Sequence, residues 1–281
     1  MAVPLSTPPP GPLPRLPEPT SVDDVARNLD RIIDWSINAE STIGYFAVLY
    51  KRATFAVRQG LQDGAFKDPQ QMQRFDLVFA KRYFDALNAY FHPHAYHGVT
   101  APWEVSFVGQ ADSDATMIQH MMTGLNAHIC FDLGVSAATV APHTLQDLEP
   151  DFFRVNALLG SQVPGLLDII EKLSPEFRRI RWLVPNETFW IRRLIVKFRT
   201  GAWWFAVALA ENPAQAKQKM VNQSAWTSAL GAWYLDPPEK WRPFHHIVNV
   251  ISKRESHNVG ANIAALAGIA EKPHPLIKKL L

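Results

Sequence analysis

The chain has 281 residues, of which 47% are hydrophobic and 19% charged, and its formal net charge is +2. This composition excludes a disordered chain, and so weak a charge gives no indication of a nucleic-acid partner. The single cysteine, Cys130, excludes an internal disulfide framework and a cysteine-rich zinc ribbon. No apolar run reaches the roughly 18 residues of a membrane-spanning helix. We therefore expect a soluble globular protein without a membrane span.

The first twenty residues are rich in proline, and no basic segment followed by an apolar one marks a secretory signal. We expect residues 1–20 to form a flexible, polyproline-like arm or, alternatively, an arm that wraps around a partner subunit. Ser21 is the predicted N-cap of the first helix, with Asp23 and Asp24 in its first turn. Without an export signal, we expect a cytoplasmic protein with reduced Cys130.

Apolar residues at helical spacing predict helices through residues 21–281. A break near residues 36–41 divides the first periodic stretch into two helices, and residues 103–108 are either a short extended piece or a helical turn. Further helices are predicted at 69–91, 114–136, 151–159, 164–173, 187–211, from 214 onward, 245–254 and 258–270. No stretch alternates with the period of a strand. The sequence therefore predicts one all-α, multi-helix bundle domain.

The strongest candidate site lies in the predicted helix 114–136, where polar residues interrupt an apolar sequence. At about 100° per residue, His128 and Asp132 lie about 40° apart on one helix face, and His120 lies about 80° from His128. Gly124 lies between them and leaves room for a ligand to approach. Burying such groups without partners costs about 1–3 kcal/mol each. They must therefore bond to one another, to other helices, to water, to a metal or to a substrate.

Three interpretations of this helix face stay open. In the first, Asp132 orients His128 as a general base or acid, while His120 and Asn126 polarise a carbonyl group or hold water. In the second, His120, His128 and Asp132 bind one divalent metal ion, with a further ligand among His94, His97 and His143. In the third, the same groups form a buried polar network that ties helices together.

Other polar and aromatic residues are candidates for substrate binding. Asn156 is an amide within an apolar segment, and the tryptophans that crowd the second half of the chain are typical of a core or of an apolar ligand site. The candidate substrate-binding residues are Asn156, Arg199, Trp203 and Tyr83. Arg199 could bind an anionic ligand, or it could pair with Asp76 or Asp85.

Two further charged residues have simpler interpretations. Asp151 directly follows Pro150, so we expect it to cap the helix that begins there. Arg82 and Asp85 are three residues apart on a helix, a spacing that predicts an ion pair.

Four ordered segments resemble a helical bacterial family of unknown function, DUF5995. They are RFDLVFAKRYFDAL (74–87), HMMTGLNAHICFDLG (120–134), DFFRVNALLG (151–160) and KFRTGAWWFAVALAE (197–211). The resemblance covers residues 22–215 and leaves 216–281 as a C-terminal helical extension. It implies an all-helical domain but no established activity. The polar residues that it singles out are Asp76, Arg82, His120, Asn126, His128, Asp132, Asn156 and Arg199.

A second resemblance is local. His128 and Asp132 are similar to the His-x-x-x-Asp helix that supplies metal ligands in zinc-dependent phospholipases C and S1-type nucleases. Only these two residues match. Those families also use a mature N-terminal amine, which this proline-rich start would not supply.

Together these patterns predict an enzyme that acts on a small, largely apolar molecule inside a helical bundle. The reaction would be a hydrolysis, or a cyclisation or elimination such as occurs in specialised metabolism, with no cofactor or with one divalent metal ion. One alternative is a non-catalytic binding protein for an apolar ligand, and another is a structural or partner-binding helical protein. A homo-oligomer stays open.

Overall fold

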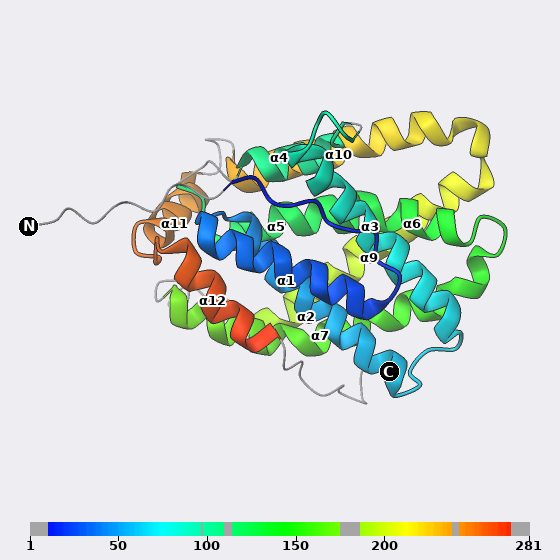
Figure 1. Cartoon of the computed structure of the whole chain (residues 1–281), viewed down its shortest axis with the longest axis horizontal. Helices are drawn as coiled ribbons and strands as arrows, with labels where there is room; N and C mark the ends of the chain where they lie inside the picture. Colours follow the sequence, from blue (N-terminus) through cyan, green and yellow to red (C-terminus); the bar gives the residue numbers. More distant parts are fainter. Residues whose placement is uncertain (1–10, 97, 110–113, 175–185, 238–241, 271–281) are drawn as a thin grey trace, which may run out of the picture.

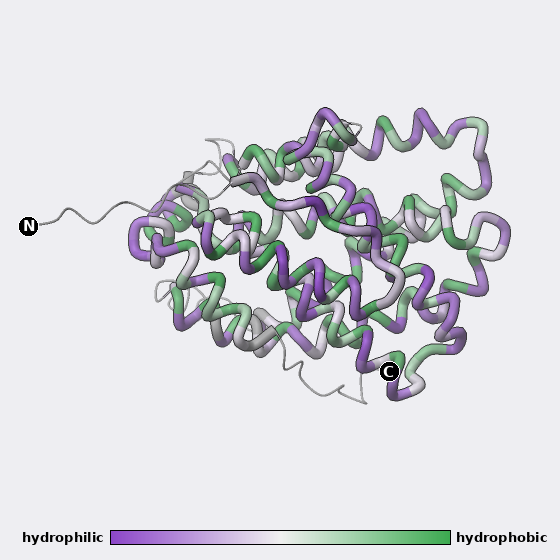
Figure 2. Tube along the Cα trace, in the orientation of Figure 1, coloured by the Kyte–Doolittle hydropathy of each residue, from purple (hydrophilic) through white to green (hydrophobic). Residues whose placement is uncertain are grey.

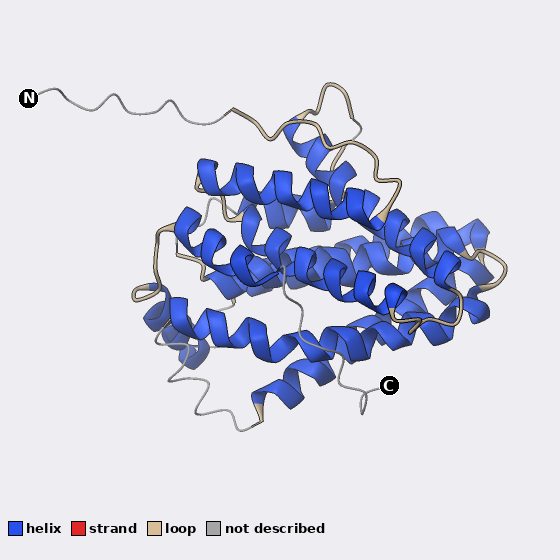
Figure 3. Ribbon diagram, turned by 60° about the horizontal axis from the view of Figure 1, so that its bottom comes forward, coloured by secondary structure: helices blue, strands red, loops and turns tan. Residues whose placement is uncertain are grey.

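The computed structural model describes residues 11–96, 98–109, 114–174, 186–237 and 242–270. Helices joined by turns and loops make up this part of the chain, which contains no strand (Figure 3). The predicted all-α fold is confirmed. The helical elements are α1 (Val22–Ala39), α2 (Ile43–Gln62), α3 (Pro69–Phe91), α4 (Ala101–Val108), α5 (Met117–Asn126), the π-helix η2 (Ala127–Asp132), α6 (Leu133–Val140), α7 (Leu145–Leu173), α9 (Glu187–Glu211), the 3₁₀-helix η3 (Pro213–Gln215), α10 (Ala216–Leu235), α11 (Arg242–Ser252) and α12 (Val259–Ala270) (Figure 1).

Local sequence explains where several helices begin. The side chain of Ser21 accepts a hydrogen bond from the backbone N–H of Asp24, which confirms the predicted N-cap of α1. Asp68 caps α3 in the same way, and Pro69 occupies the first helical position, where no N–H is needed. Thr116 starts α5 with a capping box.

The helices pack around one apolar core. α2 packs against α1, α5, α7 and α12, while α9 packs against α6 and α7. Hydrophilic and hydrophobic residues recur along α1 (Figure 2), and its apolar residues Val25, Leu29 and Ile32 are buried. α10 packs against α4 and α5, and α12 lies beside α1 at one end of the molecule (Figure 1). α10 and α12 therefore pack against helices that precede residue 215.

Residues 145–173 form one helix, whereas the sequence analysis predicts two, at 151–159 and 164–173. Pro150 and Pro164 both lie inside α7. A proline inside a helix removes a hydrogen bond and costs about 3 kcal/mol. α7 packs against α2 and α9, and its side chains Leu148 and Phe152 are fully buried. The stabilisation from this packing offsets the cost of the two prolines inside the helix.

The proline-rich segment is docked over residues 11–20, so the predicted flexible arm is wrong for this part. Leu13 and Leu16 are buried in the core. The Asn88 side chain on α3 accepts a hydrogen bond from Leu16 N–H at 2.8 Å and donates one to Leu16 C=O at 2.9 Å. Residues 1–10 lie outside the described part of the chain.

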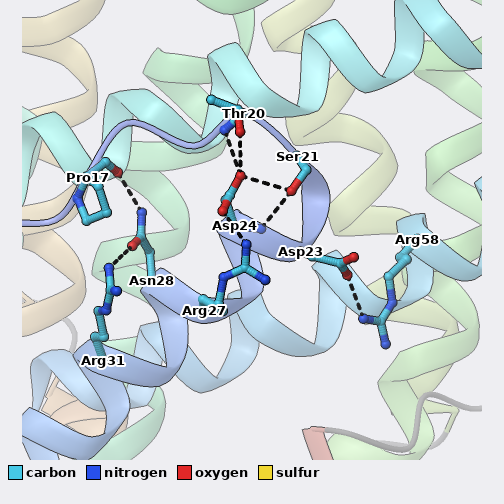
Figure 4. A network of polar contacts seen from close by, with 9 residues as sticks. All are labelled: Pro17, Thr20, Ser21, Asp23, Asp24, Arg27, Asn28, Arg31 and Arg58. Carbon is cyan, nitrogen blue, oxygen red and sulfur yellow. Dashed lines mark hydrogen bonds and ion pairs between the residues drawn. The ribbon is translucent and has the colours of Figure 1, made fainter.

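Polar contacts fix the junction between this segment and α1 (Figure 4). Asn28 Nδ2 donates to the carbonyl oxygen of Pro17 at 2.8 Å. The hydroxyl groups of Thr20 and Ser21 both donate to one carboxylate oxygen of Asp24. These bonds set the direction in which the chain enters α1.

None of the described helices combines the length and the hydropathy that a bilayer-spanning segment needs.

Candidate functional site

His128 and Asp132 lie in a π-helix, whereas the sequence analysis predicts a continuous α-helix there. All six residues of η2 (Ala127–Asp132) are buried, and the N–H of Leu133 donates to the carbonyl oxygen of His128, five residues earlier. π-Helical turns are rare and occur frequently at functional sites. The wider turn sets how the side chains of His128 and Asp132 face the surrounding helices.

Asp132 is buried, and both of its carboxylate oxygens have partners. Oδ1 accepts a hydrogen bond from Arg82 Nε at 2.7 Å. Oδ2 accepts one from Trp103 Nε1 at 2.7 Å and lies 3.5 Å from His128 Nδ1. Burial opposes ionisation, but the charge of Arg82 and the hydrogen bonds from His128 and Trp103 outweigh it and lower the pKa of Asp132. Asp132 is therefore a carboxylate at neutral pH.

The partner of Arg82 is thus Asp132 on the neighbouring element and not the predicted Asp85. Asp85 pairs instead with Lys81, four residues earlier, at 2.7 Å. Of these two acids, Asp132 is 1% exposed, so the ion pair joins a buried carboxylate to a partly exposed guanidinium.

His128 is enclosed by aromatic rings. Its imidazole stacks on Phe79 with ring centroids 3.6 Å apart and contacts the ring of Tyr50 at 4.5 Å. Burial lowers the pKa of His128 more than Asp132 raises it, so the imidazole is neutral at pH 7. With Nδ1 facing a carboxylate, the proton belongs on Nδ1. Nε2 then carries the lone pair, and this buried atom has no hydrogen-bond partner among the described residues.

The His128 ring lines a cavity of about 320 Å³, whose other lining residues come from α2, α3, α5, α6, α7, α9 and η2 itself. Its volume lies within the range of small-molecule sites and is about twice that of an engineered protein cavity that binds benzene. Most of the lining is aliphatic or aromatic. The side chains with polar groups in the lining are those of Tyr50, Arg52, Thr54, Asp76, His128, Gln162 and Arg199.

Asp76 is a second buried carboxyl group in this wall. Its Oδ2 has no hydrogen-bond partner among the described residues, and burial raises the pKa of Asp76 to about 7. The ring of Tyr50 contacts His128, and burial together with the charge of Asp76 raises the pKa of the Tyr50 hydroxyl group. The Tyr50 hydroxyl also has no partner in the described structure.

Tyr50 is absent from the sequence predictions, and Asp76 appears there among the polar residues of the family resemblance and as a possible partner of Arg199, without a role in the site. The spacing predicts burial of Asp76, because this acid shares an apolar helix face with Phe79 and Tyr83 at spacings of three and seven residues. An acid in such a stripe is buried. Its accessibility from a cavity depends on neighbouring helices and cannot be read from the spacing.

Arg199 lies in the same cavity wall, on α9, and it is 2% exposed. Its Nη2 donates to the carbonyl oxygen of Phe152 at 2.6 Å, and its guanidinium lies 4.5 Å from the centre of the Phe152 ring. Nε is buried and has no hydrogen-bond partner among the described residues. Arg199 forms an ion pair with neither Asp76 nor Asp85, the two partners that the sequence analysis considers.

His120 and Asn126 do not join His128 at the cavity. His120 lines a separate pocket of about 10 Å³ and stacks on Tyr45, with ring centroids 6.1 Å apart. Asn126 Nδ2 donates to the carbonyl oxygen of Thr227 at 2.7 Å and so ties α5 to α10. The predicted role of these two residues beside His128 is therefore not supported by their positions.

The predicted gap at Gly124 is filled. A Cβ atom at this position would lie 2.5 Å from Cγ of Phe46. The glycine allows α2 to pack closely on α5 and leaves no space for a ligand.

Three predicted substrate-binding residues lie outside the cavity lining. Trp203 is buried against Phe152 and Phe153, and Tyr83 stacks on Trp103 with ring centroids 4.8 Å apart. Asn156 is half-buried on α7. Arg199 is the one member of the predicted set that lines the cavity.

The predicted metal site is not assembled. No three side chains of His, Cys, Asp or Glu in the described part of the chain are close enough together to hold a metal ion. His120 lines its own pocket, and the Asp132 oxygens already bind donors from Arg82 and Trp103. Of the further ligands considered, His94 and His143 are exposed, and His97 lies outside the described residues.

Asp151 has a structural role that differs from the predicted one. It lies inside α7, so it does not cap that helix. Its two carboxylate oxygens accept hydrogen bonds from the backbone N–H groups of Lys67 and Asp68, at 2.7 and 2.8 Å. It therefore holds the turn that leads into α3.

Comparisons with curated proteins and with solved structures give no match. A family model, described as a family of unknown function (DUF5995), matches residues 22–242. The match includes all the cavity-lining residues named above and extends past residue 215, where the resemblance in the sequence analysis ends. The chain therefore belongs to the DUF5995 family of unknown function.

Proposed function

We propose that the protein is an enzyme that transforms a small, largely apolar molecule in the 320 Å³ cavity, with His128 as the general base. The observation that carries the proposal is the state of the His128 ring. Nδ1 faces a buried carboxylate, while Nε2 has no hydrogen-bond partner in the described structure. A neutral imidazole with a free lone pair can accept a proton from a bound substrate.

Asp132 supports this role in two ways. Its carboxylate selects the tautomer with the proton on Nδ1, and it stabilises the imidazolium that forms when Nε2 accepts a proton. Arg82 and Trp103 hold the carboxylate in place through bonds of 2.7 Å. A purely structural histidine would be expected to use both ring nitrogens, because an unpaired buried one costs about 1–3 kcal/mol.

A proton donor is also available. The pKa of Asp76 is raised to about 7 by burial, so a large fraction of Asp76 carries a proton at neutral pH. Hydrolysis, elimination and cyclisation each need one group that removes a proton and one that delivers a proton. In this proposal His128 removes it from water or from the substrate, and Asp76 delivers it to the departing or developing anion.

A second candidate function is non-catalytic binding of an apolar ligand. It is favoured by the walls of the cavity, which are mostly aliphatic and aromatic side chains from α2, α3, α5, α7 and α9. Under this alternative the unpaired groups of His128 and Asp76 would bond to the ligand without changing it.

One experiment distinguishes the two functions. The purified protein is incubated with a bacterial small-molecule extract, and the compounds in the extract are followed by mass spectrometry. The wild type should deplete at least one compound and accumulate its product, while His128→Gln should bind the compound without converting it. His143→Gln, at an exposed histidine, is the matched control and should behave as the wild type. Conversion by His128→Gln at the wild-type rate contradicts the role of His128, and retention of an unchanged compound by all three proteins favours the binding function.

A further inference from the structure

Arg199 places a positive charge at the apolar cavity, and no described residue supplies a counter-ion for it. The side chain lines the cavity and is 2% exposed. Burial lowers the pKa of its guanidinium to about 9, so it stays protonated at pH 7. Within the described part of the chain, no ion pair joins it to a carboxylate.

The residues around Arg199 provide acceptors for only part of its hydrogen-bonding capacity. Phe152 supplies one carbonyl acceptor at 2.6 Å and a ring face at 4.5 Å, whereas the buried Nε has no acceptor in the described structure. A buried cation without a counter-charge is costly, because it loses its hydration on burial and gains no opposite charge in return. An anion that enters the cavity would supply what the protein leaves out.

We propose that the cavity selects amphipathic monocarboxylates, whose carboxylate binds Arg199 and whose apolar body lies along the aliphatic and aromatic walls. The inference rests on the proposed function, because it assigns a substrate class to the same cavity. The functional group to be transformed would lie at the part of the wall formed by His128, Tyr50 and Asp76.

A carboxylate fits better than a doubly charged head group. A guanidinium edge and a carboxylate are both planar and form two parallel hydrogen bonds. The carboxyl group of Asp76, which lines the same cavity, disfavours a second negative charge on the ligand.

The cavity size sets the length of the ligand. Its volume of about 320 Å³ accommodates roughly a dozen non-hydrogen atoms, by comparison with the smaller cavity that binds benzene. The rings of Phe152, Phe75 and Phe79 form a continuous series of contacts from Arg199 to His128. An apolar chain of this length would lie between the anion site and the reactive end.

Titration calorimetry with three matched probes, decanoate, decanol and decylamine, tests this selection. The wild type should bind decanoate about 10- to 100-fold more tightly than decanol, the range expected for a charge-assisted hydrogen bond, and decylamine most weakly. Arg199→Gln should bring decanoate down to the affinity of decanol and leave decanol unchanged. Arg193→Gln, at an exposed arginine on the same helix, is the control and should retain the preference.

Several outcomes would overturn the proposal: equal or tighter binding of decanol to the wild type, no binding of any probe, or an equal loss for all probes in Arg199→Gln. If Arg199→Gln does not fold, the comparison of the three probes on the wild type decides alone. His128→Gln should retain the affinity for decanoate. A lost carboxylate preference with conversion intact would refute only the substrate class, and a retained preference without conversion would refute only the enzyme proposal.

Discussion

Two buried carboxyl groups near His128 differ in how the protein treats them. Asp132, in η2, has donors on both oxygens, from Arg82 and from Trp103. Asp76, on α3, is one of the residues that line the cavity, and its buried Oδ2 has no hydrogen-bond partner among the described residues. The pKa of Asp132 is lowered, whereas that of Asp76 is raised to about 7. Asp132, which has a hydrogen-bond donor on each oxygen, holds other side chains in place. In our proposal Asp76, which has an unpartnered oxygen, interacts with a ligand.

The largest effect on stability is expected when Asp132 is replaced. Asp132→Ala would leave the buried Trp103 N–H and His128 Nδ1–H, and the partly exposed Arg82 guanidinium, without their acceptor. Removing one partner of a buried ion pair costs about 3–5 kcal/mol, so the free energy of unfolding in urea should fall by that amount. Asp85→Ala, which removes the exposed pair with Lys81, is the control and should cost less than about 1 kcal/mol. Equal effects of the two variants would contradict the contrast.

Asp76, in contrast, should make the stability of the protein depend on pH. Because the pKa of Asp76 is raised from 3.8 to about 7 in the folded chain, the folded state holds a proton that the unfolded state releases between pH 4 and 7. The contribution of Asp76 is therefore present below pH 4 and is lost as the pH rises through 7, by about 1.4 kcal/mol per pH unit.

Asp76→Asn keeps a neutral side chain of similar shape and isolates this dependence. The variant should match the wild type near pH 4 and be more stable by about 4 kcal/mol near pH 8, measured by urea unfolding at both values. A difference that is the same at the two pH values would show that Asp76 does not titrate between them, and the contrast with Asp132 would then fail.

The sequence predicts the helices well where one face is apolar and the ends carry strong signals. The predicted range 187–211 is that of α9, and Ser21 and Asp68 cap α1 and α3. The failures have one physical cause, which is packing between segments distant in the chain. Such packing keeps Pro150 inside α7 and docks Leu16 on Asn88.

The candidate site was predictable in part. The pairing of His128 with Asp132 follows from their spacing, and the structure retains it at 3.5 Å. The angular argument fails for His120, which lines a different pocket. Residues of α2, α3, α5, η2, α6, α7 and α9 line the cavity, so no pattern within one helix reveals that Asp76 lines it or that Phe46 fills the space beside Gly124.

The protonation state of His128 tests the central claim most directly. Nitrogen-15 NMR of histidine-labelled protein at pH 7 reports which ring nitrogen carries the proton. We predict a neutral ring with the proton on Nδ1, and a shift of the Nε2 resonance when decanoate fills the cavity, with the resonances of exposed His143 unchanged. A protonated imidazolium, a proton on Nε2, or an Nε2 resonance that ignores the ligand would contradict the assignment of His128 as a base at the cavity wall.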